Sequence, residues 1–308
     1  MLCLTSMLLL LFPVHTFARC NDLDLTVTLR NPQNSRVKGQ CRNSYHGRTY
    51  NSFTNIPYAE PPIGKRRLQK PRPIRPWKGI YDATEEGIVC VQDPVFPSDV
   101  MLGTEDCLVL NVYTPMISRN SSTLLPVLFW IHGGAFQFGS GMYLLGFGSF
   151  AKFDPSFLMD EEIVVVTINY RLGSLGFLTT EDDVIPPNLG LRDQYLALKW
   201  VQENIDLFGG NPRDIVISGE SAGAASVCYH LLSHGPEMKA VTGAILISGT
   251  CLAHWALNKD IRAKAFNVGK KLGYSSDNNS ANLLRQFQSL PVNTPPISLL
   301  KPTTVVYQ

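Results

Sequence analysis

Five short apolar runs constrain the fold of this 308-residue chain more than any other feature. Each run is rich in β-branched residues and is apolar at nearly every position. Strands of this kind are buried on both faces, which is typical of a largely parallel sheet with helices on both faces. The runs span residues 108–113, 127–131, 163–168, 215–218 and 244–247.

Helical patterns lie between and after these runs. Residues 191–205 are amphipathic, with Leu198, Val201 and Ile205 on one face. Alternating apolar residues at 23–29 predict a half-buried edge strand. We therefore expect an α/β protein. The further helices are expected at residues 222–232, 259–272 and 281–290.

A Gly-Glu-Ser-Ala-Gly sequence places Ser221 on the turn between the strand at 215–218 and the next helix. Gly219 and Gly223 leave room for a sharp turn, on which the serine hydroxyl stands clear of the sheet. The helix N-terminus favours negative charge near that hydroxyl. We interpret Ser221 as a catalytic nucleophile, and the alternative is a tight turn with an incidental serine.

A second glycine-rich turn, His-Gly-Gly-Ala-Phe at residues 132–136, directly follows the strand at 127–131. Glycines leave backbone N–H groups free to point into a cavity, where they stabilise an oxyanion. We expect His132 to fix the turn rather than to act as a catalytic base. The predicted oxyanion hole comprises Gly133, Gly134, Ala135 and Ala222.

Several further motifs stand in an order that is similar to one known family. They are EDCLVLNVYTP at 105–115, NYRLG at 169–173, NLGLRDQ at 188–194, FGGNP at 208–212 and SGT at 248–250. From roughly Val27 to Leu272, the chain resembles the N-terminal part of a type-B carboxylesterase, in the cholinesterase-like branch of the α/β-hydrolases. The resemblance implies an α/β-hydrolase fold.

The resemblance also implies a reaction and further site residues. It implies hydrolysis of a small-molecule carboxylic ester through an acyl-enzyme on Ser221, without a cofactor or metal ion. The residues implied are Glu220 and Ser248 as supporting groups, Phe136 and Trp255 in the substrate pocket, and Cys90 and Cys107 as a disulfide.

Two features narrow the type of esterase that the resemblance implies. Cholinesterases hold a quaternary ammonium on a tryptophan in the loop between the cysteines matched by Cys90 and Cys107, and this loop contains no tryptophan. Juvenile-hormone esterases usually carry glutamine before the serine, where this chain has Glu220. We therefore expect a general carboxylesterase of insect type.

The sequence offers no convincing proton acceptor for Ser221. In α/β-hydrolases the acid and then the histidine follow the serine along the chain. His230 lies about 13 Å of helical rise from Ser221, and His234 lies farther away. His254 falls in a loop where the family has no base. The resemblance therefore predicts that the acid and histidine lie beyond Gln308, so that the 308-residue chain alone is inactive.

Two expectations and one alternative arise from that prediction. The chain would be the N-terminal portion of the domain, with the C-terminal strands missing, and a sheet that ends at residues 244–247 would expose an apolar edge. The alternative is a catalytically inactive, cholinesterase-like binding or adhesion protein. Retention of Ser221, Glu220 and the glycine-rich loop favours the enzyme.

The N-terminus predicts secretion. Residues 2–12 are apolar apart from Thr5 and Ser6, which is too short for a bilayer span and suits a signal peptide cleaved after Ala18. The alternative is an uncleaved anchor. We expect a secreted mature chain from residue 19 to 308 without a membrane span.

In a secreted protein the cysteines can form disulfides, and two sequons can be glycosylated. Asn120 and Asn278 begin acceptor sequences for N-glycosylation. Besides the implied disulfide, the predicted mature chain has four cysteines whose pairing the sequence leaves open, and the last two could also be buried thiols. They are Cys20, Cys41, Cys228 and Cys251.

The charge balance argues against a nucleic-acid partner. The 27 basic and 25 acidic residues leave a formal charge of +2. A basic, proline-rich segment at 57–79 could bind polyanions, but we interpret it as a solvated surface segment.

Overall fold

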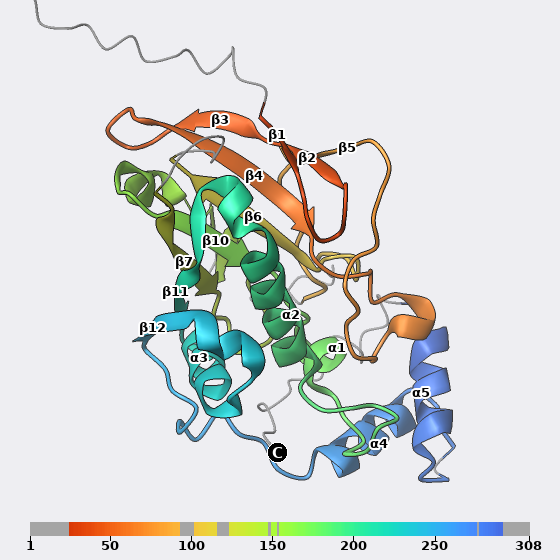
Figure 1. Ribbon diagram of the computed structural model, residues 1–308. Coiled ribbons are helices and arrows are strands. Elements are labelled where there is room, and N and C mark those ends of the chain that lie inside the picture. Colours follow the sequence, from red (N-terminus) through yellow and green to blue (C-terminus); the bar gives the residue numbers. More distant parts are fainter. Residues whose placement is uncertain are drawn as a thin grey trace, which may run out of the picture.

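The computed structural model describes residues 25–92, 102–115, 123–146, 149–152, 154–275 and 277–291. The expected signal peptide and Asn120 lie outside these residues. Figure 1 shows a central sheet with strand order β12-β11-β7-β10-β6-β4-β3. Its strands are β3 (Gln40–Asn43), β4 (Thr49–Pro57), β6 (Val109–Thr114), β7 (Leu125–Ile131), β10 (Val164–Ile168), β11 (Gly210–Glu220) and β12 (Val241–Ile247).

All five predicted apolar runs are strands of this sheet, and they pair in two ways. Strands β12, β11, β7 and β10 are parallel to one another. Strand β6 pairs antiparallel with both β10 and β4, and β4 pairs antiparallel with β3. The sheet is therefore mixed: the expected parallel pairing covers one half, and the antiparallel half differs from the expectation.

The described helices cover mainly one face of the sheet (Figure 1). Helix α2 (Leu189–Asn204) and helix α3 (Ala222–Ser233) pack there, over side chains such as Phe129 and Ile217. On the opposite face, the described cover is the short 3-10 helix η3 (Pro155–Asp160). Helical segments therefore lie on both faces, as expected, with two α-helices on one face and a single short 3-10 helix on the other in the described residues.

Strand β12 forms one edge of the central sheet. Three consecutive side chains near its end are exposed: Ile245 by 46%, Leu246 by 38% and Ile247 by 44%. The apolar edge expected from the sequence is thus present in the described residues. Such an edge offers unpaired backbone groups and apolar side chains to another polypeptide segment.

The predicted N-terminal strand lies outside the central sheet. Only three of its residues form a strand, which is an edge strand as predicted, but of a separate three-stranded sheet rather than of the main one. This small sheet comprises β1 (Thr26–Thr28), β2 (Arg36–Lys38) and β5 (Ile80–Asp82). A further hairpin joins β8 (Tyr143–Gly146) and β9 (Ser149–Lys152).

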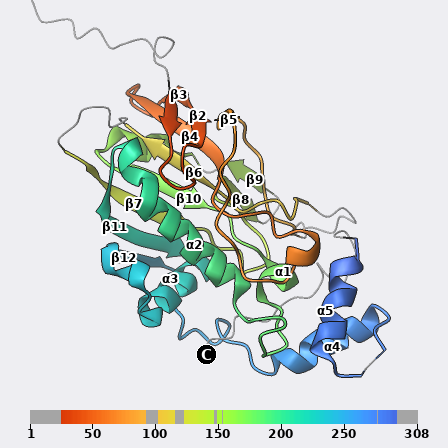
Figure 2. The same cartoon turned by 45° about the vertical axis from the view of Figure 1, so that its right-hand side comes forward.

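Three helices surround a second, smaller core at one end of the molecule (Figure 2). Arg67, from the basic segment, is buried there: it pairs with Glu105 at 2.6 Å and donates to the carbonyls of Phe287 and Leu290. No helix within the described ranges is long and apolar enough to cross a membrane. The three helices are α1 (Gly173–Phe177), α4 (Ile261–Lys271) and α5 (Ser280–Ser289).

Candidate active site

Ser221 occupies the single-residue turn between β11 and α3. Its backbone dihedrals are φ 54° and ψ −115°, a combination that costs a non-glycine residue about 1–3 kcal/mol. Two backbone hydrogen bonds hold it: its N–H donates to Ile247 O at 2.8 Å, and its carbonyl accepts from Ala225 N at 3.0 Å. A serine held in strained backbone is a candidate for function rather than for turn formation.

The two glycines that flank Ser221 are required by close backbone contacts. A Cβ at Gly219 would lie 2.4 Å from the carbonyl carbon of Gly223. A Cβ at Gly223 would lie 2.1 Å from the carbonyl oxygen of Ile131. Any side chain at either position would therefore force apart β7, β11 and α3, which meet at this turn.

The glycine-rich loop after β7 also has strained backbone. Gly134, Ala135 and Phe136 have φ values of 102°, 53° and 59° in succession. The Gly134 carbonyl accepts from the N–H groups of Gln137 and Phe138, and the Phe136 carbonyl accepts from Gly173. These bonds hold a conformation that L-residues seldom adopt.

This loop lies beside Ser221. A Cβ built on Gly133 would stand 3.2 Å from the Ser221 Cβ and 2.4 Å from a carboxylate oxygen of Glu220. Within the described ranges, the N–H groups of Gly134, Ala135 and Ala222 donate to no protein acceptor. The donors expected for an oxyanion hole thus have no acceptor among the described residues, and they lie on the loop beside the serine and at the start of α3.

His132 is buried at the base of this loop. Its Nδ1 donates to the Gly133 carbonyl at 2.8 Å, and its ring stacks on Tyr170 with centroids 4.4 Å apart. The Tyr170 hydroxyl in turn donates to the His132 carbonyl at 2.9 Å. Burial lowers the pKa of His132 to about 4, although the Gly133 carbonyl partly opposes that shift. These contacts suit the structural role expected for His132.

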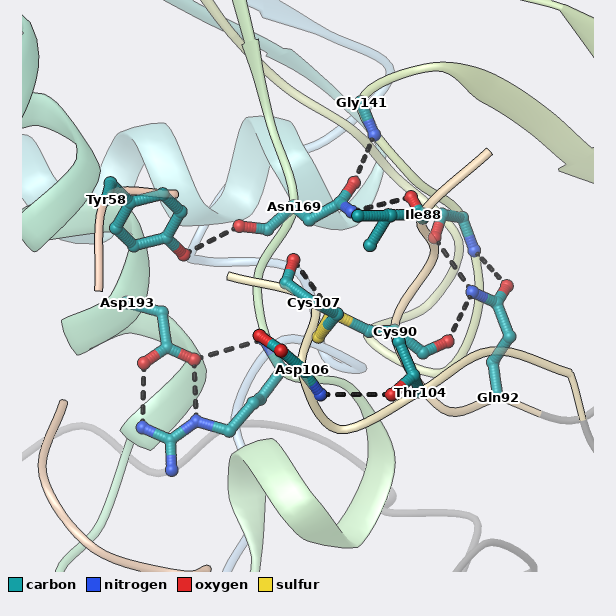
Figure 3. Close-up of a disulfide and its surroundings, with 12 residues drawn as sticks. Tyr58, Ile88, Cys90, Gln92, Thr104, Asp106, Cys107, Gly141, Asn169 and Asp193 are labelled. Atoms are coloured by element: carbon teal, nitrogen blue, oxygen red, sulfur yellow. Dashed lines mark hydrogen bonds and ion pairs between the residues drawn. A yellow bond between two sulfur atoms is a disulfide. The ribbon is translucent and has the colours of Figure 1, made fainter. Parts of the chain in front are cut away.

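Asn169 fastens the chain at Gly141, between the glycine-rich loop and β8 (Figure 3). Its amide oxygen accepts from Gly141 N at 2.8 Å, and its amide nitrogen donates to Ile88 O at 2.9 Å. The Tyr58 hydroxyl donates to the Asn169 carbonyl at 2.7 Å. In the sequence, Asn169 stood out only as part of a motif, and these bonds show its local role.

Gln92 provides a second anchor that the sequence did not indicate. Its amide oxygen accepts from Gly139 N at 2.8 Å. Its amide nitrogen donates to Gly139 O at 3.1 Å and to Cys90 O at 2.9 Å. Cys90 and Cys107, the pair that the resemblance implied, form a buried disulfide beside it (Figure 3). A lone glutamine carries no local pattern, so only the fold reveals this contact.

The remaining predicted site residues lie at different depths. Glu220 is half-buried beside Gly133, and burial raises the pKa of its carboxyl group. Phe136 is fully buried against Phe177 rather than in an open cavity. Ser248 is exposed just after β12, and Trp255 is half-buried against the main core. No described hydrogen bond joins Ser248 to Glu220.

No histidine in the described part of the chain bonds to Ser221. His230 is buried, and its Nε2 donates instead to the Gln194 amide oxygen at 2.8 Å. His234 ends α3 with its Nδ1 at 3.1 Å from Leu231 O, and His254 is exposed. The described residues also contain no group of three or more metal-binding side chains. The site therefore contains a strained serine with free backbone donors nearby.

Comparison with known proteins identifies the family. Residues 24–294 match the carboxylesterase family. The chain belongs to this family. It is 45% identical over 246 residues to a carboxylic ester hydrolase of Bombus ignitus, and 43% identical over 258 residues to venom carboxylesterase-6 of Apis mellifera. A juvenile hormone esterase of Tribolium castaneum is 43% identical over 222 residues.

These relatives agree with the predicted insect-type, type-B carboxylesterase and with its α/β-hydrolase fold. The matches cover 79%, 83% and 71% of this chain, respectively. They cover only 42%, 44% and 36% of the three relatives. The chain therefore spans less than half the length of the curated relatives that it matches.

A second disulfide of this chain resolves an alternative that the sequence left open. Cys228 on α3 is bonded to Cys251 in the segment after β12, so neither is a free thiol. Cys41 is also disulfide-bonded, and Cys20 lies outside the described residues. Cys228 and Cys251 are 23 positions apart, and only the approach of α3 to the end of β12 brings them together.

Proposed function

We propose that this chain carries the nucleophile and the oxyanion donors of a serine-type carboxylic ester hydrolase. The observation that supports this most directly is the strained backbone of Ser221, at φ 54° and ψ −115°, between β11 and the N-terminus of α3. Such strain persists at functional sites when the surrounding structure enforces it. The family assignment agrees with this chemistry.

The proposed reaction is acyl transfer in two halves. The Ser221 oxygen attacks the ester carbonyl carbon while a base accepts its proton, and the negative oxygen rests on the N–H groups of Gly134, Ala135 and Ala222. The C–O bond to the alcohol then breaks, and the alcohol leaves with a proton. Water attacks the acyl-enzyme in the same way and releases the carboxylic acid.

The base and its acid partner are proposed to come from outside the described residues. His230 is engaged with Gln194, and His234 and His254 are exposed away from any contact with Ser221. Without a base the serine hydroxyl is a weak nucleophile. We therefore expect the complete protein to hydrolyse esters, and residues 19–308 alone to react poorly.

We further propose that the protein is secreted. Two disulfides are present in the described residues, and such bonds persist mainly in oxidising compartments. Asn278, which begins one sequon, is exposed on the surface and accessible for glycosylation. These features agree with a signal peptide at residues 1–18.

Labelling of the complete natural protein by a fluorophosphonate tests the nucleophile, because the probe needs an activated serine. We expect a label on the peptide that contains Ser221, and none in Ser221→Ala. Ser233→Ala, near the other end of α3, is the matched control and should label normally. Unchanged labelling of Ser221→Ala would refute the proposed mechanism.

Substitution at Gly134 tests the oxyanion donors. A Cβ there would lie 2.0 Å from the Phe138 carbonyl oxygen, so Gly134→Val must displace the loop. We expect kcat/KM for ester hydrolysis to fall roughly 10²–10³-fold, the usual effect of losing one donor. Gly47→Ala serves as the control, because Gly47 also has positive φ but has open space around it. Intact hydrolysis in Gly134→Val would contradict the assigned role of the loop.

A further inference from the structure

The sheet order places a different segment on each side of Ser221. Strand β11 lies between β7 and β12, so the segments after β7 and β12 flank the turn at its end (Figure 1). The glycine-rich loop follows β7 and brings Gly133 close to Ser221. Residues 248–256, here called the 248–256 segment, follow β12. A Cβ at Gly249 in this segment would lie 2.3 Å from the Ser221 carbonyl oxygen.

The 248–256 segment is fastened at both ends. At its start, Ser221 N donates to Ile247 O at 2.8 Å. Near its end, the Tyr229 hydroxyl of α3 donates to the carbonyl of Ala256, which is fully buried, at 2.6 Å. Trp255 packs against the main core. These contacts hold the ends in place without any covalent bond.

The middle of the 248–256 segment is held by the disulfide. Cys251 is 8% exposed and is bonded to Cys228 on α3, whose sulfur also lies 3.6 Å from the Thr250 hydroxyl. This cross-link lies two residues beyond Gly249, the point at which the segment contacts Ser221. The disulfide is therefore suited to set the position of the segment relative to the serine.

We propose that the Cys228–Cys251 disulfide fixes the 248–256 segment as the wall of the ester site opposite the glycine-rich loop. The wall limits the size of one substituent of the reacting carbon, which makes the two cysteines specificity-determining positioning residues. The inference rests on the proposed role of Ser221. If the disulfide were purely structural, its removal would instead change kcat/KM for all substrates by the same factor.

The first test is the double variant Cys228→Ala/Cys251→Ala in the complete natural protein. One series of p-nitrophenyl esters varies the acyl chain from acetate to octanoate, and a second series varies the alcohol with acetate held constant. We expect kcat/KM for the longest member, relative to the shortest, to rise roughly tenfold in one series only, the scale on which pocket walls discriminate methylenes. Unchanged ratios in both series, or equal changes in both, would overturn the inference.

The second test leaves the disulfide intact and so stands even if the double variant fails to fold. Gly249→Ala must shift the segment away from the Ser221 carbonyl, and we expect fluorophosphonate labelling to slow roughly 10- to 100-fold. Gly243→Ala on β12 is the matched control, because its Cβ would meet Val216 at an ordinary 3.5 Å. Equal labelling rates in Gly249→Ala and Gly243→Ala would also overturn the inference.

The two proposals fail in distinguishable ways. Labelling that persists in Ser221→Ala would refute the proposed mechanism. Labelling that requires Ser221 but ignores Gly249→Ala, with unchanged ester ratios in the double variant, would refute only the role of the 248–256 segment.

Discussion

Replacing His230 by glutamine tests whether burial keeps the histidines of this fold neutral. His230 begins a buried chain of hydrogen bonds: its Nε2 donates to Gln194, Gln194 donates to Ser226 at 3.1 Å, and Ser226 donates to Ala222 O at 2.9 Å. Glutamine preserves a donor to Gln194 but does not titrate. The substitution therefore removes the charge change and keeps the hydrogen bond.

The expected magnitude is set by the pKa. Burial lowers the pKa of His230 to about 4, whereas the ordinary value for histidine is 6.5. As pH falls below 6.5, His230 binds a proton in the unfolded state but not in the folded state. Its contribution to the unfolding free energy is therefore fully present above pH 6.5 and is lost as the pH falls toward 4. At about pH 5 the loss is about 2 kcal/mol for each such histidine. His132 has the same shift, so the two histidines together contribute about 4 kcal/mol to the loss, and His230→Gln removes about 2 kcal/mol of it.

Urea unfolding at about pH 7.5 and about pH 5, followed by tryptophan fluorescence, measures this difference. The pH-dependent loss of unfolding free energy should be about 2 kcal/mol smaller in His230→Gln than in the natural protein. His254→Gln, at an exposed position, should behave as the natural protein does. If His230→Gln loses as much stability on acidification as the natural protein, then the buried ring of His230 is not the source of the effect.

Three further predictions address other parts of the structure. Arg171→Met should lower the unfolding free energy by about 3–5 kcal/mol in urea titrations, because fully buried Asp193 loses its bidentate partner, and Arg171→Met/Asp193→Leu should recover most of that loss. Gly223→Ala should cost about 1–3 kcal/mol through its clash with Ile131 O, and an unchanged Tm would contradict the close packing inferred there. Asn278→Gln should lower the mass of the secreted protein by one glycan, and an identical mass would show that Asn278 is unmodified.

The strands and helices were predictable where one local pattern dominates. The five apolar runs all became strands of the central sheet, and residues 191–205 and 222–232 became α2 and α3 within a few residues. Continuous apolar runs and a 3.6-residue period depend only on neighbours along the chain. They are therefore visible in the sequence.

Strand β4 was missed because its residues do not look buried. It contains Asn51, Ser52, Thr54 and Asn55, all at most 8% exposed. Partners distant in sequence satisfy Thr54 and Asn55: the Thr54 hydroxyl donates to the Ala83 carbonyl at 3.0 Å, and Asn55 N donates to the Asn111 side chain at 2.9 Å. No short window contains such a partner, so the antiparallel half of the sheet could not be predicted.

The candidate site, like the sheet, has one part that the local sequence predicts and another that only the tertiary structure shows. The sequence by itself determined the strand–turn–helix around Ser221, because Gly219, Gly223 and the apolar run before them lie within a few residues of it. The tertiary structure decided the surroundings of that turn: the Gln92 anchor and the Cys228–Cys251 disulfide. Both depend on the strand order β7-β11-β12 and on how the loops pack at its end. That order results from packing between distant segments, which no local pattern encodes.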